Sequence, residues 1–287
     1  MGISDINKIP ETVEQMSSID KLYYKRLLQY IKTTLKIDVT QYKDNYIIRR
    51  LKVRMKATKC SSFKEYYEYL RTHPEEKEKL EETLTVNVTE FWRDITVYKE
   101  LMKIIDNFIK DKSRRKLRVW SAGCSSGEEP YGVAIIILES MKKNNRKMFD
   151  AKITGTDIDK EVLNKARRGV YHIKQLRNLP ANIIQKYFTK LNDEEYMIKP
   201  EVKRLVTFKI HDLIKDPPLK NMDIVMCRNV IIYFDKKTQA ELFLKFYEAL
   251  NPGGFLILGK TEILHGKAKE LFKTYNARER IYQKPLE

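Results

Sequence analysis

The sequence predicts an α/β protein in which a small all-helical amino-terminal domain precedes a larger domain built on a parallel sheet. Two patterns indicate this division. Up to Leu84 the apolar residues recur with helical spacing, and strand-like alternation is absent. From Leu117 onward, short β-rich apolar runs alternate with helical stretches, which is typical of βαβ units. At 287 residues the chain is long enough for one medium domain and a smaller companion.

The helical domain is predicted to cover residues 1–84. Its apolar positions form two helical faces, with Leu22, Leu27, Leu28 and Ile31 on one and Phe63, Tyr66, Tyr67 and Leu70 on the other. Pro74, followed by a Glu- and Lys-rich run, is typical of the first turn of a last helix. That helix leads into a connecting segment, residues 85–116, which contains the stretch TVNVTEFWRD.

The sheet domain is predicted to cover residues 117–287. Six apolar runs indicate its strands, at 117–120, 153–156, 205–210, 224–227, 255–258 and 280–283. Between residues 169 and 204 this rhythm breaks, and the stretch YMIKPEVKRLVTFK alternates apolar and polar residues. The alternation predicts a short antiparallel hairpin, at about 187–208, inserted into the sheet domain.

The chain is strongly basic, with 56 Lys and Arg against 39 Asp and Glu and a formal net charge of +17. Such a field favours a nucleic acid, an anionic membrane or an acidic protein as partner. Residues 41–59 hold seven basic residues and one acidic residue, and the rest of the first 80 residues is nearly neutral. The charge of the helical domain is therefore concentrated in one stretch.

Cysteine usage and hydropathy predict a cytoplasmic protein that does not insert into the membrane. The three cysteines, Cys60, Cys124 and Cys227, are too widely spaced for a disulfide framework or a CxxC metal site, so we expect no bound metal. The longest aliphatic run, residues 133–138, is far shorter than the roughly 20 residues of a membrane span. An apolar signal segment is not found at the amino terminus.

The stretch VWSAGCSSGEEPYG, residues 119–132, passes from a predicted strand into small residues and then into two carboxylates. Gly123 is the candidate for a tight turn, and only Gly127 joins it, so the spacing differs from the dinucleotide fingerprint. Glu128 and Glu129 at the helix start would repel a pyrophosphate but suit an uncharged nucleoside with a cationic group. S-adenosylmethionine fits this description; the alternative is that both glutamates only stabilise the helix dipole.

Later strands also end in polar residues. In GTDID, Asp157 follows the second strand, where a carboxylate accepts hydrogen bonds from a ribose diol. Its alternative role is a helix N-cap, for which Asp159 is the better candidate. In KIHDL, Asp212 is predicted to accept the adenine amino group, and Leu213 to pack on the ring. The fourth strand runs into MCRNVIIYF, whose polar side chains are placed as those that line a ligand crevice.

Five stretches, NVTEFWRD, VWSAGCSSGEEPYG, GTDID, CRNVIIYFD and GGFLILGKTE, closely resemble in order and spacing the chemotaxis receptor methyltransferases of the CheR type. The likeness covers nearly the whole chain. It implies a class I, Rossmann-like methyltransferase domain with an inserted antiparallel β-subdomain, behind the helical domain. It also implies that S-adenosylmethionine donates methyl groups to glutamate side chains of chemoreceptor cytoplasmic helices, for sensory adaptation, with S-adenosylhomocysteine as product.

The resemblance also assigns site residues. The implied cofactor contacts are Asn87, Thr89, Arg93, Glu129, Asp157, Asp212, Leu213, Asn229 and Val230, to which the turn argument adds Gly123. A glutamate carboxylate is already ionised and a sulfonium methyl already activated, so catalysis needs positioning and removal of water. Arg93 is predicted to orient the incoming carboxylate. Tyr233 is predicted to hydrogen-bond it or to wall the methyl channel, with packing in an aromatic-rich segment as the alternative.

Two segments are predicted to meet the receptor. On a helical wheel of residues 41–59, one face is apolar and the others are basic. The alternative for these cations is an ordinary solvated charged face. The resemblance implies that acidic receptor helices dock on this helix in a salt-sensitive way, through Arg49, Arg50, Arg54 and Lys56. In some family members the hairpin binds a receptor pentapeptide through a glycine-containing turn. Residues 187–208 contain no glycine, which implies a pentapeptide-independent member.

Two other functions remain open from the residues. An RNA methyltransferase would use the same sheet and the basic charge, but it predicts a stacking platform or a base-pocket motif, and neither is found, so we expect no nucleic-acid partner. A sensor or scaffold that binds S-adenosylmethionine without turnover would keep the cofactor residues. Cofactor binding without methyl transfer would distinguish it from an enzyme.

Overall fold

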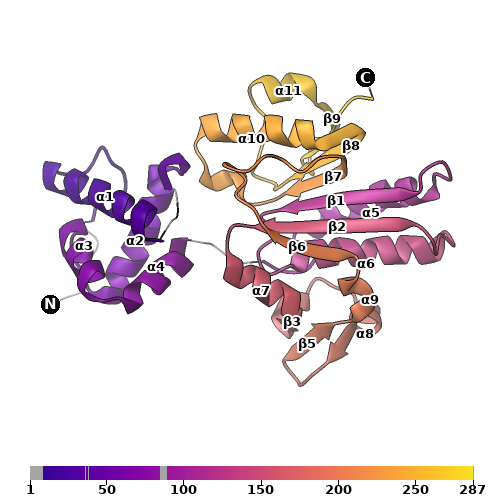
Figure 1. Ribbon diagram of the computed structural model, residues 1–287, viewed down its shortest axis with the longest axis horizontal. Helices are drawn as coiled ribbons and strands as arrows, with labels where there is room; N and C mark the ends of the chain where they lie inside the picture. The colour runs from indigo at the N-terminus through magenta and orange to yellow at the C-terminus, as the bar shows by residue number, and fades with distance from the viewer. Residues whose placement is uncertain (1–8, 36, 38, 85–88, 287) are drawn as a thin grey trace. The chain divides into compact units, whose positions relative to one another are not determined.

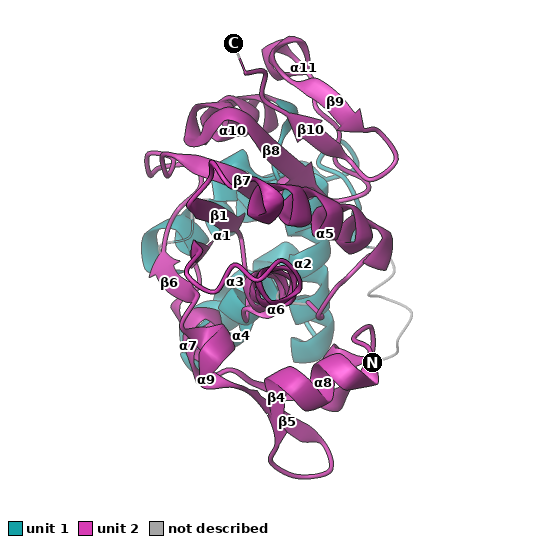
Figure 2. Cartoon of the chain, turned by 90° about the vertical axis from the view of Figure 1, so that its right-hand side faces the viewer, with its two compact units in different colours: residues 1–86, 233–236 teal, residues 87–232, 237–287 magenta. Residues whose placement is uncertain are grey.

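The computed structural model describes residues 9–35, 37, 39–84 and 89–286, and the chain divides into two units (Figures 1 and 2). Unit 1 comprises Met1–Val86 and Tyr233–Lys236. Unit 2 comprises Asn87–Ile232 and Lys237–Glu287. Within the described residues, no helix combines the length and the apolar character that a membrane span requires.

Unit 1 is built mainly from helices. They are α1 (Ser18–Tyr30), the π-helical turn η2 (Ile31–Leu35), the 3₁₀ turn η3 (Val39–Gln41), α2 (Asp44–Thr58), α3 (Phe63–Thr72) and α4 (Glu75–Leu84). Ser17 and Ser62 cap α1 and α3, because each hydroxyl accepts a backbone N–H from the first turn. The helix predicted after Pro74 is α4. The predicted all-helical domain is thus confirmed.

Unit 2 contains a seven-stranded sheet in the order β6-β2-β1-β7-β8-β10-β9 (Figure 1). Its strands are β1 (Lys116–Ala122), β2 (Asp150–Asp157), β6 (Val206–Ile210), β7 (Met222–Cys227), β8 (Leu250–Leu258), β9 (Lys273–Asn276) and β10 (Ile281–Gln283). The first five strands of this order are parallel, and β10 runs antiparallel to both of its neighbours, β8 and β9. All six runs predicted as strands are strands, so the predicted α/β class is confirmed.

Helices precede, connect and follow the strands of unit 2. They are α5 (Ile95–Lys110), α6 (Glu128–Lys143), α7 (Lys160–Arg168), α8 (Ala181–Tyr187), α9 (Pro200–Lys203), α10 (Lys236–Ala249) and α11 (Lys267–Leu271), with the 3₁₀ turns η4 (Ile173–Leu176) and η5 (Ile231–Tyr233). Most of these helices have one buried apolar face, and α6 is buried almost all round. Because the four strands β6, β2, β1 and β7 are parallel neighbours, their carboxyl ends lie along one edge of the sheet.

A second, three-stranded antiparallel sheet is inserted between α7 and β6. Its order is β3-β5-β4, with strands β3 (Val170–His172), β4 (Phe188–Lys190) and β5 (Glu195–Ile198). The predicted hairpin is therefore present as β4 and β5, but it ends at Ile198. Pro200 instead occupies the first turn of the short helix α9, where its fixed φ angle suits a helix start, and the chain enters the main sheet at Val206.

Candidate functional site

The turn between β1 and α6 is closely packed. Gly123 and Gly127 have φ angles of +76° and +93°, in the region that favours glycine. The backbone N–H groups of Gly123 and Cys124 donate to the carbonyl of Thr156 in β2, at 2.8 and 2.9 Å. A Cβ atom on Gly123 would lie 2.5 Å from Cγ2 of Val230, a residue that follows β7 in the chain. The tight turn predicted at Gly123 is present, and it brings the chain after β1 against the chain after β7.

Glu129 lies in the first turn of α6 with a side chain that is 12% exposed. Ser121 Oγ donates to Glu129 Oε1 at 2.8 Å, and Arg228 Nη1 lies 3.6 Å from Oε2. Burial raises the pKa of Glu129, and the nearby Arg228 guanidinium opposes this shift. A carboxylate in these surroundings has lost most of its water, so a cationic group of a ligand would stabilise its ionised form.

Glu128, by contrast, faces the protein interior. Ser126 Oγ donates to both of its oxygens at 2.9 Å, and Gln175 Nε2 of η4 donates to Oε1. Burial raises the pKa of Glu128 to about 7. The Gln175 carbonyl also accepts the backbone N–H of Phe91 at 2.9 Å. Glu128 therefore links the start of α6 to η4 and, through Gln175, to the segment before α5.

Arg228, directly after β7, holds that same segment. Its side chain is only 3% exposed, and Nη2 donates to the carbonyl of Arg93 at 2.8 Å and to Asp94 Oδ2 at 2.7 Å. The guanidinium also lies over the Tyr98 ring, 5.5 Å from its centroid. Arg228 therefore fixes the backbone of the predicted catalytic residue Arg93. Arg228 was predicted only as one of the polar side chains after the fourth strand that line a ligand crevice, because it directly follows a buried strand; its contact with Arg93 was not predicted.

Asp157 ends β2. Its Oδ2 accepts the backbone N–H of Ser125 at 2.8 Å, and its Oδ1 accepts that of Asp159 at 3.1 Å. Asp159, not Asp157, is the N-cap of α7, since its side chain accepts the N–H groups of Glu161 and Val162. Each oxygen of Asp157 can accept a further hydrogen bond. Burial raises the pKa of this carboxyl group.

Asp212 and Leu213 lie in the loop that follows β6. Asp212 Oδ1 accepts the backbone N–H of Ile214 at 2.9 Å, so one carboxylate oxygen helps to shape the loop. Lys245 Nζ, from α10, donates at 2.5–3.1 Å to three carbonyls, those of Leu213, Ile214 and Asp216. An ammonium group has three donors, and this lysine uses all of them on one loop. Leu213 is thereby held at the end of β6.

Asn229 and Val230 lie in a loop held by a buried carboxylate. Glu262 is 4% exposed, and its oxygens accept the backbone N–H groups of Asn229 (3.0 Å), Val230 (3.0 Å), Ile232 (3.2 Å) and Gly259 (2.6 Å). Asn229 itself has a φ angle of +60°, which this anchoring maintains. Glu262 is the last residue of the motif GGFLILGKTE, and its hydrogen bonds to this loop were not predicted.

The strand-end carboxylates are arranged in sequence along the sheet edge. Asp212, Asp157 and Glu129 follow β6, β2 and β1, which are neighbours in that order. An adenine, a ribose diol and an ammonium group occur in the same order along S-adenosylmethionine. Asp212, Asp157 and Glu129 therefore fit that cofactor, and the carboxylates at the turn disfavour a pyrophosphate. No group of three or more His, Cys, Asp or Glu suited to a metal ion is found within residues 9–35, 37, 39–84 and 89–286.

Two further predicted contacts precede α5. Asn87 lies outside the described residues. Thr89 is half-buried, next to Glu90, whose carboxylate pairs with Arg177 Nε at 2.6 Å. The Phe91 ring packs edge-on against Tyr171, with centroids 4.9 Å apart, and so joins this segment to the small sheet. Cofactor contacts at Asn87 and Thr89 stay predictions.

Tyr233 belongs to the four residues that are assigned to unit 1. Its ring lies 4.6 Å from the Tyr46 ring of α2, and its carbonyl accepts the backbone N–H of Lys43 at 2.9 Å. The aromatic packing of Tyr233, which was the alternative to a catalytic role, is thus present. Tyr233 also directly follows Ile232, whose N–H Glu262 holds. A catalytic role for its hydroxyl stays a prediction.

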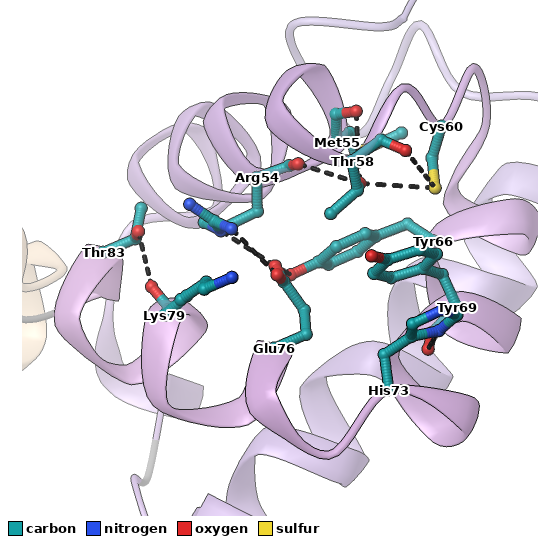
Figure 3. Close-up of polar contacts among 10 residues, drawn as sticks. All are labelled: Arg54, Met55, Thr58, Cys60, Tyr66, Tyr69, His73, Glu76, Lys79 and Thr83. Carbon is teal, nitrogen blue, oxygen red and sulfur yellow. Dashed lines mark hydrogen bonds and ion pairs between the residues drawn. The ribbon is translucent and has the colours of Figure 1, made fainter.

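The basic helix predicted within residues 41–59 is α2, whose apolar face is buried as expected. Of the predicted docking residues, Arg49 and Lys56 are exposed and Arg50 is half-buried. Arg54 makes two hydrogen bonds of 2.8 Å to Glu76 of α4, which also accepts from Tyr66 at 2.9 Å (Figure 3). Glu76 is 2% exposed, so Arg54 joins α2 to α4. Docking through Arg54 stays a prediction.

Two family models match the chain. The model described as "CheR methyltransferase, SAM binding domain" matches residues 87–281, and "CheR methyltransferase, all-alpha domain" matches residues 23–85. Among curated relatives, "Chemotaxis protein methyltransferase" of Borreliella burgdorferi is 34% identical over 87% of this chain and 90% of the relative. "Chemotaxis protein methyltransferase 2" of Vibrio cholerae is 34% identical over 76% of this chain and 77% of the relative. "Chemotaxis protein methyltransferase" of Listeria innocua is 33% identical over 90% of this chain and 95% of the relative.

Proposed function

The chain belongs to the CheR methyltransferase family, and we propose that it esterifies glutamate side chains on the cytoplasmic helices of chemoreceptors with methyl groups from S-adenosylmethionine. The reaction takes place in the cytoplasm and serves sensory adaptation in chemotaxis. The observation that carries this proposal is the row of carboxylates Asp212, Asp157 and Glu129 at the ends of three adjacent parallel strands. Arg228 adds to it, because it fixes the backbone of Arg93 beside the same edge.

The proposed methyl transfer requires little proton transfer by the protein. A glutamate side chain has a pKa of about 4.3 and is ionised at neutral pH, so its attack on a methyl group requires no general base. The bound cofactor supplies that methyl group in an activated form. What the chain contributes is orientation of the two partners and exclusion of water, which strengthens each electrostatic contact.

Arg93 is the residue we assign to the incoming carboxylate. A guanidinium presents two parallel donors that match two carboxylate oxygens, and so fixes the direction of approach. Arg228 donates to the Arg93 carbonyl and so fixes the Arg93 backbone from which this guanidinium extends. Tyr233 is assigned as a second hydrogen-bond donor to the acceptor carboxyl or as a wall of the methyl channel.

The exposed cations of α2 are proposed to dock the acidic receptor helix. The double substitution Arg49→Glu with Lys56→Glu should raise KM for the receptor and leave cofactor affinity unchanged, because neither side chain belongs to the cofactor site. Lys25→Glu with Lys79→Glu makes the same change of charge on exposed positions of α1 and α4 and serves as control. Equal KM values for both double variants would remove α2 from docking.

The turn of the inserted hairpin supports independence from a receptor pentapeptide. Between β4 and β5, Asn192 Oδ1 accepts the backbone N–H groups of Glu194 (2.9 Å) and Glu195 (2.8 Å). The Asn192 side chain thus closes a turn that contains no glycine. Titration with a receptor carboxyl-terminal pentapeptide should leave the amide spectra of β4 and β5 unchanged, and saturable shifts there would contradict the proposal.

The reaction class is tested by incubating the protein with methyl-labelled S-adenosylmethionine and receptor-containing membranes. We expect label on the receptor band and none on added RNA. Asp157→Ala, which removes the proposed ribose acceptor at the end of β2, should abolish labelling at low cofactor concentration. Label on RNA would favour an RNA methyltransferase, and cofactor binding without any transfer would favour a sensor.

A further inference from the structure

The charge of unit 2 is concentrated in two short stretches, residues 110–118 and 142–152. Together they hold eleven basic residues and two acidic residues, which is a net charge of +9. With the +6 of residues 41–59, three stretches account for +15 of the total of +17. The remaining residues are close to neutral even though they contain many lysines. A general preference for lysine therefore does not explain the concentration.

These two stretches lie side by side at one edge of the sheet. The first leads from α5 into β1 and the second from α6 into β2, and the strands are parallel neighbours with Lys116 in register with Asp150. The two connections therefore meet at the amino-terminal edge, opposite the edge that carries Asp157 and Glu129 (Figure 1). We call residues 110–118 and 142–152 the basic edge.

The two connections of the basic edge are bound to each other. Arg146 donates to the carbonyls of Ile109 (2.9 Å), Asp111 (3.1 Å) and Arg114 (2.5 Å). Arg118 forms an ion pair of 2.5 Å with Asp150 across β1 and β2. These contacts fix the shape of the basic edge, so the surface need not become ordered when a partner binds.

The basic edge presents its cations outward, together with one apolar side chain. Its exposed cations are Lys110, Lys112, Arg115, Lys116, Lys142, Lys143, Lys147 and Lys152. Both of its acids, Asp111 and Asp150, lie next to arginines of the edge. Met148 is 96% exposed, while the neighbouring Phe149 is buried. Met148 is therefore an apolar side chain of the basic edge that is available to contact the apolar part of a partner.

We propose that the basic edge binds the anionic lipid surface of the membrane in which the receptors lie. Lysines and arginines near an anionic leaflet are attracted to its headgroups, and Met148 reaches the interfacial region. The contact is peripheral. A nucleic acid fits less well, because the exposed side chains of the basic edge include no aromatic ring on which a base could stack. The link to receptors rests on the proposed function, but the lipid contact itself does not.

Binding to vesicles tests the lipid contact without any methyl transfer. The wild type should sediment with phosphatidylcholine vesicles that contain phosphatidylglycerol, should not sediment with pure phosphatidylcholine, and should dissociate as salt is added. Lys112, Arg115 and Lys147 have no carboxylate within ion-pair distance among the described residues. Each basic residue near such a surface contributes roughly fivefold in affinity, so their triple exchange to Glu should weaken binding at least about a hundredfold.

Two variants sharpen the result. The triple exchange of Lys267, Lys269 and Lys273 to Glu makes the same change of net charge on exposed positions outside the basic edge, and it should bind nearly as well as the wild type. Met148→Ala should weaken binding by up to about tenfold, since it removes the apolar tip and no charge. Equal losses in the two triple variants, or tighter binding to duplex RNA than to anionic vesicles at the same salt, would overturn the proposal.

A second experiment, which measures methyl transfer, distinguishes the lipid contact from the proposed function. The variant with Lys112, Arg115 and Lys147 exchanged for Glu should methylate a receptor in anionic vesicles more slowly than the wild type, and a soluble receptor fragment at the same rate. Slowing of both substrates would contradict a role of the lipid contact in methylation. If the wild type methylated neither substrate, the proposed function would fail, while the vesicle result would still decide the lipid contact.

Discussion

Replacing Glu262 by glutamine tests whether one buried carboxylate holds the loop of the predicted cofactor contacts Asn229 and Val230. Glu262 Oε1 accepts the N–H groups of Val230 and Ile232, and Oε2 accepts those of Asn229 and Gly259. Glutamine has the same shape, but an NH₂ group replaces one oxygen. The two backbone N–H groups that were bonded to that oxygen then face the NH₂ group of the glutamine and have no acceptor.

The size of the effect follows from these four bonds. A buried donor without a partner costs about 1–3 kcal/mol, so two such donors should lower the free energy of unfolding by about 2–6 kcal/mol. For a domain of this size that corresponds to a decrease in Tm of at least about 4 °C. Any shift of the loop that relieves the contact also moves Asn229 out of its conformation at a φ angle of +60°. Cofactor affinity should therefore fall as well.

Calorimetric titration with S-adenosylhomocysteine and thermal unfolding measure the two effects separately. Glu76→Gln is the matched control, because Glu76 is also a buried carboxylate with three hydrogen bonds, and it belongs to unit 1. Both variants should melt at a lower temperature. Only Glu262→Gln should bind the nucleoside at least about tenfold more weakly, with the difference retained at temperatures well below both transitions.

Two results would contradict this role of Glu262. If Glu262→Gln bound S-adenosylhomocysteine as tightly as the wild type while its Tm decreased, the carboxylate would be a stabilising group without influence on the cofactor contacts. The positions of Asn229 and Val230 would then depend on β7 and the turn at Gly123 instead. Unchanged Tm would show that the loop readily supplies other acceptors to these donors.

The remaining predictions concern the turn, the helix start and the acceptor side of the site. Gly123→Ala should reduce cofactor affinity at least about tenfold in a titration, because the new Cβ would lie 2.5 Å from Val230 Cγ2 at a φ angle of +76°. Burial raises the pKa of Glu128 to about 7 from its ordinary value of 4.5, so the folded protein binds more protons than the unfolded chain between these values. Urea unfolding should therefore show the wild type losing up to about 3 kcal/mol relative to Glu128→Gln as pH rises from about 4.5 to 7, and parallel pH profiles would contradict this. Arg93→Ala should reduce methyl transfer strongly and retain the fold, since the hydrogen bond from Arg228 goes to the Arg93 carbonyl, which alanine keeps; unchanged turnover and cofactor affinity would remove Arg93 from the mechanism.

Local sequence patterns were enough to predict where several candidate site residues lie in the fold. Buried strands that end in polar residues identify Asp157 and Asp212 because parallel strands share one carboxyl edge. The N-cap of α7 was placed correctly at Asp159, since capping involves only the next turn. Strand β9 was not predicted, because four residues with one large apolar side chain carry too weak a pattern.

Contacts between residues far apart in the sequence were beyond such patterns. Helical periodicity placed Arg54 on the polar face of α2 but gave no sign that Glu76, 22 residues away, occupies its guanidinium. The roles of Arg228 and Glu262 likewise depend on distant partners, with Arg93 135 residues from Arg228 and Asn229 33 residues from Glu262. Their common signal was a charged residue next to a buried strand, which calls for a buried partner without naming it.

The chemical form of the transferred methyl group shows whether the acceptor is a carboxylate. Receptor labelled with methyl groups from S-adenosylmethionine by this protein is treated with mild alkali, and volatile label is collected. Glutamyl methyl esters hydrolyse under these conditions, so the account predicts release of the label as methanol. Label that stays on the receptor through this treatment would contradict carboxyl methylation and would require a nitrogen or other stable acceptor.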